Sequence, residues 1–148
     1  MNLTISSMPK KSLASIFGVL FALVVSPILA QQEKQTLPIV SSAAVPSYPP
    51  TARVAGIQGE VRVLVGTDGK TVSTIRPESG HPILIEAAQD NIRTWKFAEH
   101  QPTNFVVTFR YRIEGEAVCR MDNGTVILHL PSDIQITVKG ILTCDPKK

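Results

Sequence analysis

Hydrophobic and polar residues alternate along two stretches of the chain, residues 60–65 and residues 105–113. A period of two is typical of a β-strand that buries one face. Thr67-Asp68-Gly69-Lys70 follows the first stretch and predicts a tight turn, since glycine supplies the positive φ that such a turn needs. Residues 72–76 form the returning strand, which Pro77 is expected to end. The buried face of the second stretch consists of Phe105, Val107, Phe109, Tyr111 and Ile113.

Between these two stretches the apolar residues recur at helical spacing. Pro82 suits the first position of a helix, and the apolar face of that helix consists of Leu84, Ala88, Ile92 and Trp95. A shorter helix is expected to begin near Pro50, with Ala52, Val54 and Ala55 toward the core. The order strand, strand, helix, strand predicts a two-layer α+β fold, in which one main helix packs on a three-stranded antiparallel sheet.

Residues 115–148 add further strand signals. Asn123-Gly124 lies between two apolar runs and predicts a hairpin turn. Ile134, Ile136 and Val138 alternate with polar residues, which indicates another strand. We therefore expect a C-terminal β-hairpin extension of two or three strands.

The first 30 residues are typical of a secretory signal peptide. Lys10 and Lys11 precede an uninterrupted apolar run, Leu13–Val25, and cleavage is expected after Ala30. Ile28 is larger than the residue preferred near a cleavage site, so an uncleaved N-terminal anchor remains an alternative. Residues 31–47 are polar, small and interrupted by prolines, which is typical of a linker.

Cys119 and Cys144 both lie in the exported part of the chain. An even number of cysteines in an oxidising compartment favours a disulfide, with two separate buried thiols as the alternative. A bridge would close a loop of about 25 residues and stabilise the fold by roughly 3–4 kcal/mol. Because both cysteines lie in the extension, residues 115–148, the bridge would join the start of the extension to its end.

Charge and motifs exclude several function classes. Removal of residues 1–30 takes away two lysines and no acids, so the net charge of +3 falls to +1. No cluster of basic residues with interleaved aromatics occurs, which gives nucleic-acid binding no support. The three histidines are isolated, and no nucleophile elbow, phosphate loop or zinc-protease motif is present. We therefore expect no enzyme activity, no cofactor and no metal site.

An ordered set of residues runs through the predicted elements: Tyr48-Pro49, Ala52, Gly59, Val61, Val63, Val65, Asp68-Gly69, Ser79-Gly80, Leu84, Ala87-Ala88, Trp95, Phe97 and Phe109. This set resembles the C-terminal domain of TonB-family proteins and covers residues 48–114. The resemblance implies a periplasmic module that binds a protein or peptide partner, including segments of outer-membrane proteins.

The resemblance also implies a binding mode. Members of the family capture an extended peptide by β-augmentation, in which the guest strand pairs with an exposed sheet edge. The residues implied at such a site are Tyr48, Pro49, Phe105, Val107, Thr108, Phe109 and Tyr111. For Tyr48, packing of its own helix against the sheet is an alternative. If the extension pairs with the 105–113 strand the edge is filled, and if it folds elsewhere the edge stays open.

Two other functions remain as alternatives. One is a membrane-anchored energy transducer for outer-membrane transport, and the other is a secreted inhibitor or effector with the same fold. Against the transducer, the apolar run contains no histidine, the linker is short, and Val45-Pro46-Ser47 replaces the glutamine-rich patch of the family. The expected location is periplasmic or secreted, with inner-membrane anchorage only if residues 1–30 are retained.

Overall fold

A computed structural model describes residues 36–142 and residue 144. The chain divides into two units, Met1–Glu33 and Lys34–Lys148, and every described residue lies in the second. The predicted signal peptide or anchor lies outside the described residues. Within the described part, no helix is long and apolar enough to cross a membrane.

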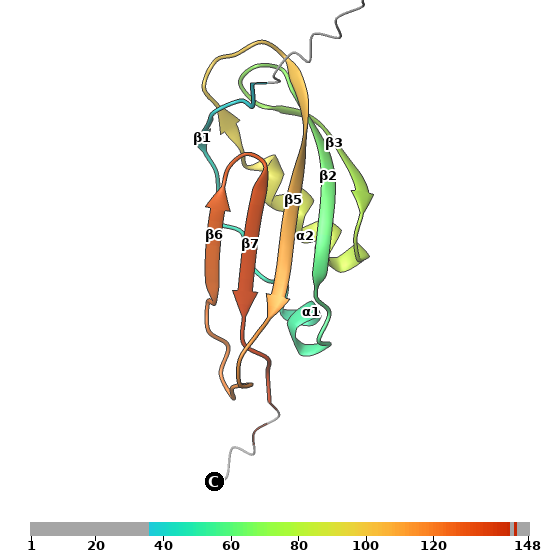
Figure 1. The fold of residues 1–148 in the computed structure, drawn as a ribbon, viewed down its shortest axis with the longest axis vertical. Coiled ribbons are helices and arrows are strands. Elements are labelled where there is room, and N and C mark those ends of the chain that lie inside the picture. The colour runs from blue at the N-terminus through green and yellow to red at the C-terminus, as the bar shows by residue number, and fades with distance from the viewer. Residues whose placement is uncertain (1–35, 143, 145–148) are drawn as a thin grey trace, which may run out of the picture. The chain divides into compact units, whose positions relative to one another are not determined.

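A five-stranded mixed sheet forms the body of the second unit (Figure 1). Its strands lie in the order β3-β2-β5-β7-β6, where β2 is Gly59–Thr67, β3 Val72–Ser79, β5 Thr103–Ile113, β6 Thr125–His129 and β7 Asp133–Val138. β2 pairs antiparallel with β3 and β5, β7 runs parallel to β5, and β6 is antiparallel to β7. The α+β class is confirmed. The sheet differs from the predicted three-stranded antiparallel one because the extension adds two strands beside β5.

Helix α2 (Pro82–Arg93) lies behind the sheet in Figure 1 and packs on β2 and β3. Pro82 occupies the first turn, and the ring of His81 accepts a hydrogen bond from the backbone of Ile83. Leu84, Ala88 and Ile92, which were predicted for its apolar face, are buried in the helix, and the buried Trp95 lies two residues beyond its end. The helical period therefore identified this element and its core face correctly.

Helix α1 (Pro50–Val54) buries a different face from the one predicted. Ala52 is buried as expected, but Val54 is 66% exposed and Ala55 is also exposed. Arg53 is buried in their place. The prediction ranked residues by hydrophobicity, whereas the extension supplies polar partners for the Arg53 guanidinium.

One hydrophobic core joins the two layers, and the extension belongs to it. Ile134, Ile136 and Val138 of β7 lie in the same cluster as the buried residues of β2, β5 and α2. Tyr48 packs edge-on against Tyr111 with ring centroids 5.4 Å apart. Because its residues are buried in this shared core, β7 is part of the same folded unit as β2, β5 and α2.

Part of the expected linker lies against this unit. Strand β1 (Val40–Ser42) pairs with the short β4 (Lys96–Phe97). The side chain of Asn91 donates to the Ala44 carbonyl at 2.8 Å and accepts from the Trp95 indole at 3.0 Å. Asn91 thus ties the segment before α1 to the end of α2.

The two turns predicted from glycine have different outcomes. The turn at Asp68-Gly69 joins β2 to β3, and backbone hydrogen bonds from Thr71 and Lys70 lower the pKa of Asp68 to about 2. The turn predicted at Asn123-Gly124 is wrong, because the β6–β7 hairpin turns at residues 130–132, where Ser132 N–H donates to the His129 carbonyl. Gly124 instead lets β6 begin close to β7: a Cβ there would lie 2.3 Å from the Thr137 carbonyl oxygen.

Candidate functional site

Most residues implied at a peptide site are not accessible to a partner. Phe105, Val107, Phe109 and Tyr111 point into the core and are almost fully buried. Tyr48 is buried too, and its hydroxyl donates to the Ile57 carbonyl at 2.6 Å. Pro49 precedes α1 and is half-buried. Tyr48 therefore packs its own helix against the sheet, which was the alternative considered from the sequence.

The β5 edge is already paired over residues 108–113. β7 aligns with it from Thr108 opposite Asp133 to Ile113 opposite Val138. Thr108 N–H donates to the Ser132 carbonyl, and Glu114 N–H donates to the Val138 carbonyl, both at 2.9 Å. Along residues 108–113, the backbone groups that a guest strand would need on β5 are thus bonded within the chain.

Displacing β7 from this edge would be costly. Ile134 and Ile136 are fully buried, and exposing such a side chain costs about 1.5–3 kcal/mol. The Arg110 guanidinium also pairs with Asp133 on β7 and with Glu60 on β2. Since a domain is stable by only about 5–15 kcal/mol, release of β7 would consume much of that stability.

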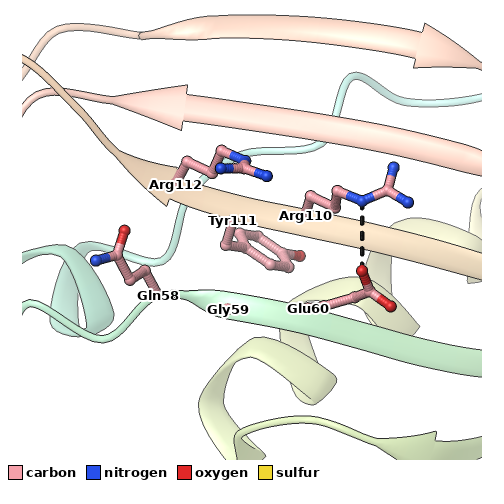
Figure 2. A pocket seen from close by; sticks show the side chains of 6 residues that line it. All are labelled: Gln58, Gly59, Glu60, Arg110, Tyr111 and Arg112. Carbon is pink, nitrogen blue, oxygen red and sulfur yellow. Dashed lines mark ion pairs between the residues drawn. The ribbon is translucent and has the colours of Figure 1, made fainter.

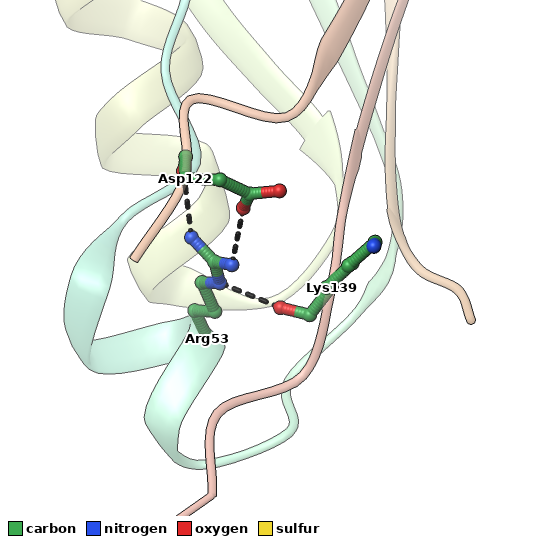
Figure 3. A network of polar contacts seen from close by, with 3 residues as sticks. All are labelled: Arg53, Asp122 and Lys139. Atoms are coloured by element: carbon green, nitrogen blue, oxygen red, sulfur yellow. Dashed lines mark hydrogen bonds and ion pairs between the residues drawn. The ribbon is translucent and has the colours of Figure 1, made fainter. Parts of the chain in front are cut away.

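Arg53 fastens the extension to α1, as Figure 3 shows. Its guanidinium donates to the Lys139 carbonyl at 2.7 Å, to the Asp122 carbonyl at 2.8 Å and to the Asp122 carboxylate at 2.6 Å. Arg53 is only 4% exposed, so these partners replace the water that a buried cation loses. The sequence offered only a weak signal for this role, a single arginine within a short apolar helix.

Replacing Arg53 by methionine is expected to lower the free energy of unfolding by about 2 kcal/mol. Methionine keeps much of the apolar stem, but the Asp122 and Lys139 carbonyls lose a charged donor. Chemical denaturation of both proteins measures the difference. Arg62→Met is the matched control, because Arg62 forms a solvent-exposed pair with Glu78 at 3.5 Å and such pairs contribute about 1 kcal/mol or less. Equal losses in the two variants would contradict a fastening role for Arg53.

The predicted disulfide is present and closes the far end of the extension. Cys119 and Cys144 are joined, with Cα atoms 5.6 Å apart. Beside the bridge, Val118 N–H donates to the Gly140 carbonyl and Leu142 N–H donates to the Val118 carbonyl. Covalent and backbone bonds therefore hold the segment after β7 against the loop that precedes β6.

A shallow pocket lies on the outer face of the sheet, and its polar side chains form bonds within the protein. It has a volume of about 360 Å³, and Figure 2 shows Arg110 and Glu60 paired across it. The Gln58 side chain accepts a hydrogen bond from Ile113 N–H at 3.0 Å. Nearby, the buried Tyr111 hydroxyl has no hydrogen-bond partner among the described residues, and burial raises its pKa. Among those residues no three His, Cys, Asp or Glu side chains cluster as metal ligands would.

The two outer strands of the sheet, β3 and β6, differ in how they face solvent. β3 carries Arg76, Pro77 and Glu78, and charged residues and proline are the usual means of protecting a sheet edge. β6 reads Thr-Val-Ile-Leu-His and has neither proline nor an acidic or basic residue other than His129. Ile127 and Leu128 are 43% and 42% exposed. β6 is thus the less protected of the two edges.

The pairing pattern indicates which β6 backbone groups face outward. Ser132 and Val138 direct their carbonyls to β5, and alternate residues of a strand direct their backbone groups to the same side. The odd-numbered residues of β7 therefore face β6, where they pair with Thr125, Ile127 and His129. It follows that the N–H and C=O groups of Val126 and Leu128 point away from the sheet and are available to another strand.

A family model described as Gram-negative bacterial TonB protein C-terminal matches residues 44–114. Residues 44–114 form a TonB C-terminal domain. No curated protein matches the chain. The matched segment holds β2, β3, α2 and β5 and ends at Glu114, so β6, β7 and the disulfide lie beyond it. TonB C-terminal domains interact with proteins such as outer-membrane receptors, and the match supports a TonB-like periplasmic protein-interaction module in residues 44–114.

Proposed function

We propose that this TonB C-terminal domain binds another protein by adding an extended segment of that protein to β6. The module is non-catalytic, is exported through residues 1–30 and acts in the periplasm. The proposal is supported by the pairing of β7 with residues 108–113 of β5, and by the β6–β7 register, which directs the backbone groups of Val126 and Leu128 away from the sheet.

Strand addition at β6 needs no rearrangement of the fold. The guest would continue the sheet from its unpaired side and would bond to a strand already held by β7. Addition along residues 108–113 of β5 would first require the removal of buried Ile134 and Ile136. Addition at β3 would place the guest beside Arg76, Pro77 and Glu78. Of the three positions, β6 is therefore the one where adding a guest strand costs the least free energy.

Leu128→Pro is expected to abolish partner binding and to leave the fold intact. Proline removes the N–H of Leu128, which points away from β7, and edge strands tolerate proline where the N–H faces solvent. Ile127→Pro is the matched control, since it removes an N–H directed at β7 and should destabilise the extension. A photo-reactive amino acid at His129 reports binding in the periplasm of the host.

The protein with photo-reactive residue 129 is expected to form adducts with a second protein, and Leu128→Pro should eliminate them at an unchanged melting temperature. A photo-reactive residue at Thr74 on β3 is the control position and should give no adduct. Adducts that form from Thr74, or that persist with Leu128→Pro, would contradict capture at β6.

A further inference from the structure

Residues 38–46, which we call the strap, lie against the short strand β4 and the end of helix α2. Pro38 and Pro46, at the two ends of the strap, are buried. Most side chains between them are exposed, and strand β1, which lies within the strap, has no buried side chain. The strap is therefore held mainly by its two prolines and by its backbone.

The backbone of the strap is bonded both to β4 and to the end of α2. Ala98 N–H donates to the Ile39 carbonyl at 2.9 Å, and β1 aligns with β4 in antiparallel register. Ala44 N–H donates to the Thr94 hydroxyl at 3.0 Å, and the Ala44 carbonyl accepts from the Asn91 side chain at 2.8 Å. One residue of the strap thus has both of its backbone groups bound by side chains at the end of α2.

The groups that receive the strap are positioned by the domain itself. The Asn91 side chain accepts from the Trp95 indole at 3.0 Å, which directs its amide nitrogen toward the strap. The Thr94 hydroxyl donates to the Asn91 carbonyl at 2.7 Å and so keeps its oxygen as an acceptor. On the other side of β4, Phe97 N–H donates to the Lys70 carbonyl at 2.8 Å. None of these three contacts involves the strap.

The strap is attached by few bonds and lies almost entirely before the family match. β1 has three residues, and its register with β4 is irregular between Val40 and Ser42. The match begins at Ala44, whereas Asn91 and Thr94 lie well inside it. A site within the TonB C-terminal domain is thus covered by a segment that precedes most of that domain.

The chemistry of the strap indicates which segments fit the site. None of its residues is charged, four small residues (Ser-Ser-Ala-Ala) occupy its centre, and a proline lies at each end. If the strap left, the amide of Asn91 would be a largely buried donor without an acceptor, which costs free energy. β4 would also have an open edge. A guest backbone of the same chemistry restores both kinds of bond.

The occupant that displaces the strap is a segment of a partner protein and not the strap of a second copy. Exchange of straps between two copies would restore at each site the bonds that the site already has. It would gain nothing there, yet it would cost the entropy of association. A partner segment replaces the same bonds and also brings contacts of the partner itself, which can offset that cost.

We infer that β4 and the end of α2 form a second strand-binding site, for extended, uncharged partner segments with small residues between two prolines, and that the strap occupies it as an internal competitor. The inference is independent of the proposed capture at β6. The probe is a labelled peptide with the sequence of residues 38–46, Pro-Ile-Val-Ser-Ser-Ala-Ala-Val-Pro. Fluorescence anisotropy measures its dissociation constant with the whole exported chain.

The peptide is expected to bind Ala44→Pro at least about ten-fold more tightly than the wild type. The change removes the N–H that the strap donates to Thr94, and it weakens a competitor that otherwise acts at high effective concentration. Val45→Pro is the matched control, because Val45 is 73% exposed and its N–H has no partner among the described residues. It should bind the peptide as the wild type does.

A modified peptide identifies the site. With N-methylalanine at the position of Ala44, the peptide lacks the N–H for Thr94 and should bind Ala44→Pro about five-fold more weakly than the parent peptide. With Thr94→Val added, the two peptides should bind equally, since the hydroxyl acceptor is gone. In the wild type, Ala98 N–H should exchange faster than Phe97 N–H, because only the former is bonded to the strap.

Five results would overturn the inference. Equal binding by Ala44→Pro and the wild type means that the strap does not compete, and binding by neither means that the site accepts no segment in trans. A preference for the parent peptide that persists with Thr94→Val means that the peptide lies elsewhere. Binding that is lost in Leu128→Pro places the peptide on β6 and leaves the proposed function intact. A concentration-dependent dimer in light scattering, abolished by Ala44→Pro, would identify the occupant as a second copy.

Discussion

Replacing Ile136 by alanine is expected to lower the free energy of unfolding by about 4 kcal/mol. Ile136 lies opposite Tyr111 on β5, is fully buried and belongs to the single core cluster. Truncation of a fully buried isoleucine removes apolar contacts and leaves a cavity, for which losses of about 2–5 kcal/mol are typical. Chemical denaturation followed by Trp95 fluorescence, a probe located outside the extension, measures the change.

Ile127→Ala on the neighbouring β6 is the matched control. Ile127 is partly exposed and lies on the outer face, so its truncation should cost about 1 kcal/mol or less. One cooperative transition, shifted strongly by Ile136→Ala, indicates that β7 and the TonB C-terminal domain fold as one unit. An early separate transition of the extension, with the Trp95 signal unchanged, would show that β7 is an appendage.

Replacing Cys144 by serine is expected to lower the free energy of unfolding by about 3 kcal/mol in oxidising buffer. The bridge joins residues 25 apart, and in the chain-entropy account a closed loop of this length stabilises a fold by roughly 3–4 kcal/mol. The same measurement in reducing buffer should give nearly equal stabilities for the variant and the wild type. Cys119→Ser should reproduce the effect.

The reducing-buffer comparison separates the bridge from the packing of the cysteine. If Cys144→Ser lost the same amount of stability in both buffers, a packing contact and not the covalent bond would be responsible. The residual stability in reducing buffer also indicates how far Arg53 and the β5–β7 pairing hold the extension without the bridge.

The features that the sequence predicted well are those set by short-range pattern. Alternation along β2 and β5 located two strands and their buried faces, and the helical period located α2 with its core residues. The Asp68-Gly69 turn was equally clear, because the Asp68 carboxylate accepts hydrogen bonds from the N–H groups of Lys70 and Thr71 within the turn. For these elements local preference and tertiary structure agree.

The features that were missed depend on contacts between distant residues. The alternation of β7 predicted a strand but carried no information about its neighbour, and its parallel pairing with β5 follows from the path of residues 114–132. Asn123-Gly124 had the sequence of a hairpin turn, yet among the described residues no strand ends directly before it: β5 ends at Ile113, and only β6 is adjacent. Arg53 was overlooked because its partners, Asp122 and Lys139, lie far along the chain.

The proposed capture at β6 follows from the pairing of β7 with residues 108–113 of β5. The matched segment keeps the family's fold, but the strand that would capture a guest is paired with the chain's own extension. The extension in turn supplies a new outer strand, β6. Under the proposed function, the choice of partner depends on residues beyond the family domain.

Residue-by-residue amide hydrogen exchange tests most directly the claim that β7 closes the β5 edge and leaves β6 open. We expect slow exchange at Thr108, Arg110, Arg112 and Glu114, whose N–H groups face β7, and fast exchange at Val126 and Leu128. Binding of an extended partner segment should slow exchange at Val126 and Leu128 alone. Fast exchange at the four β5-side amides, with Val126 and Leu128 already protected in the free protein, would contradict the account.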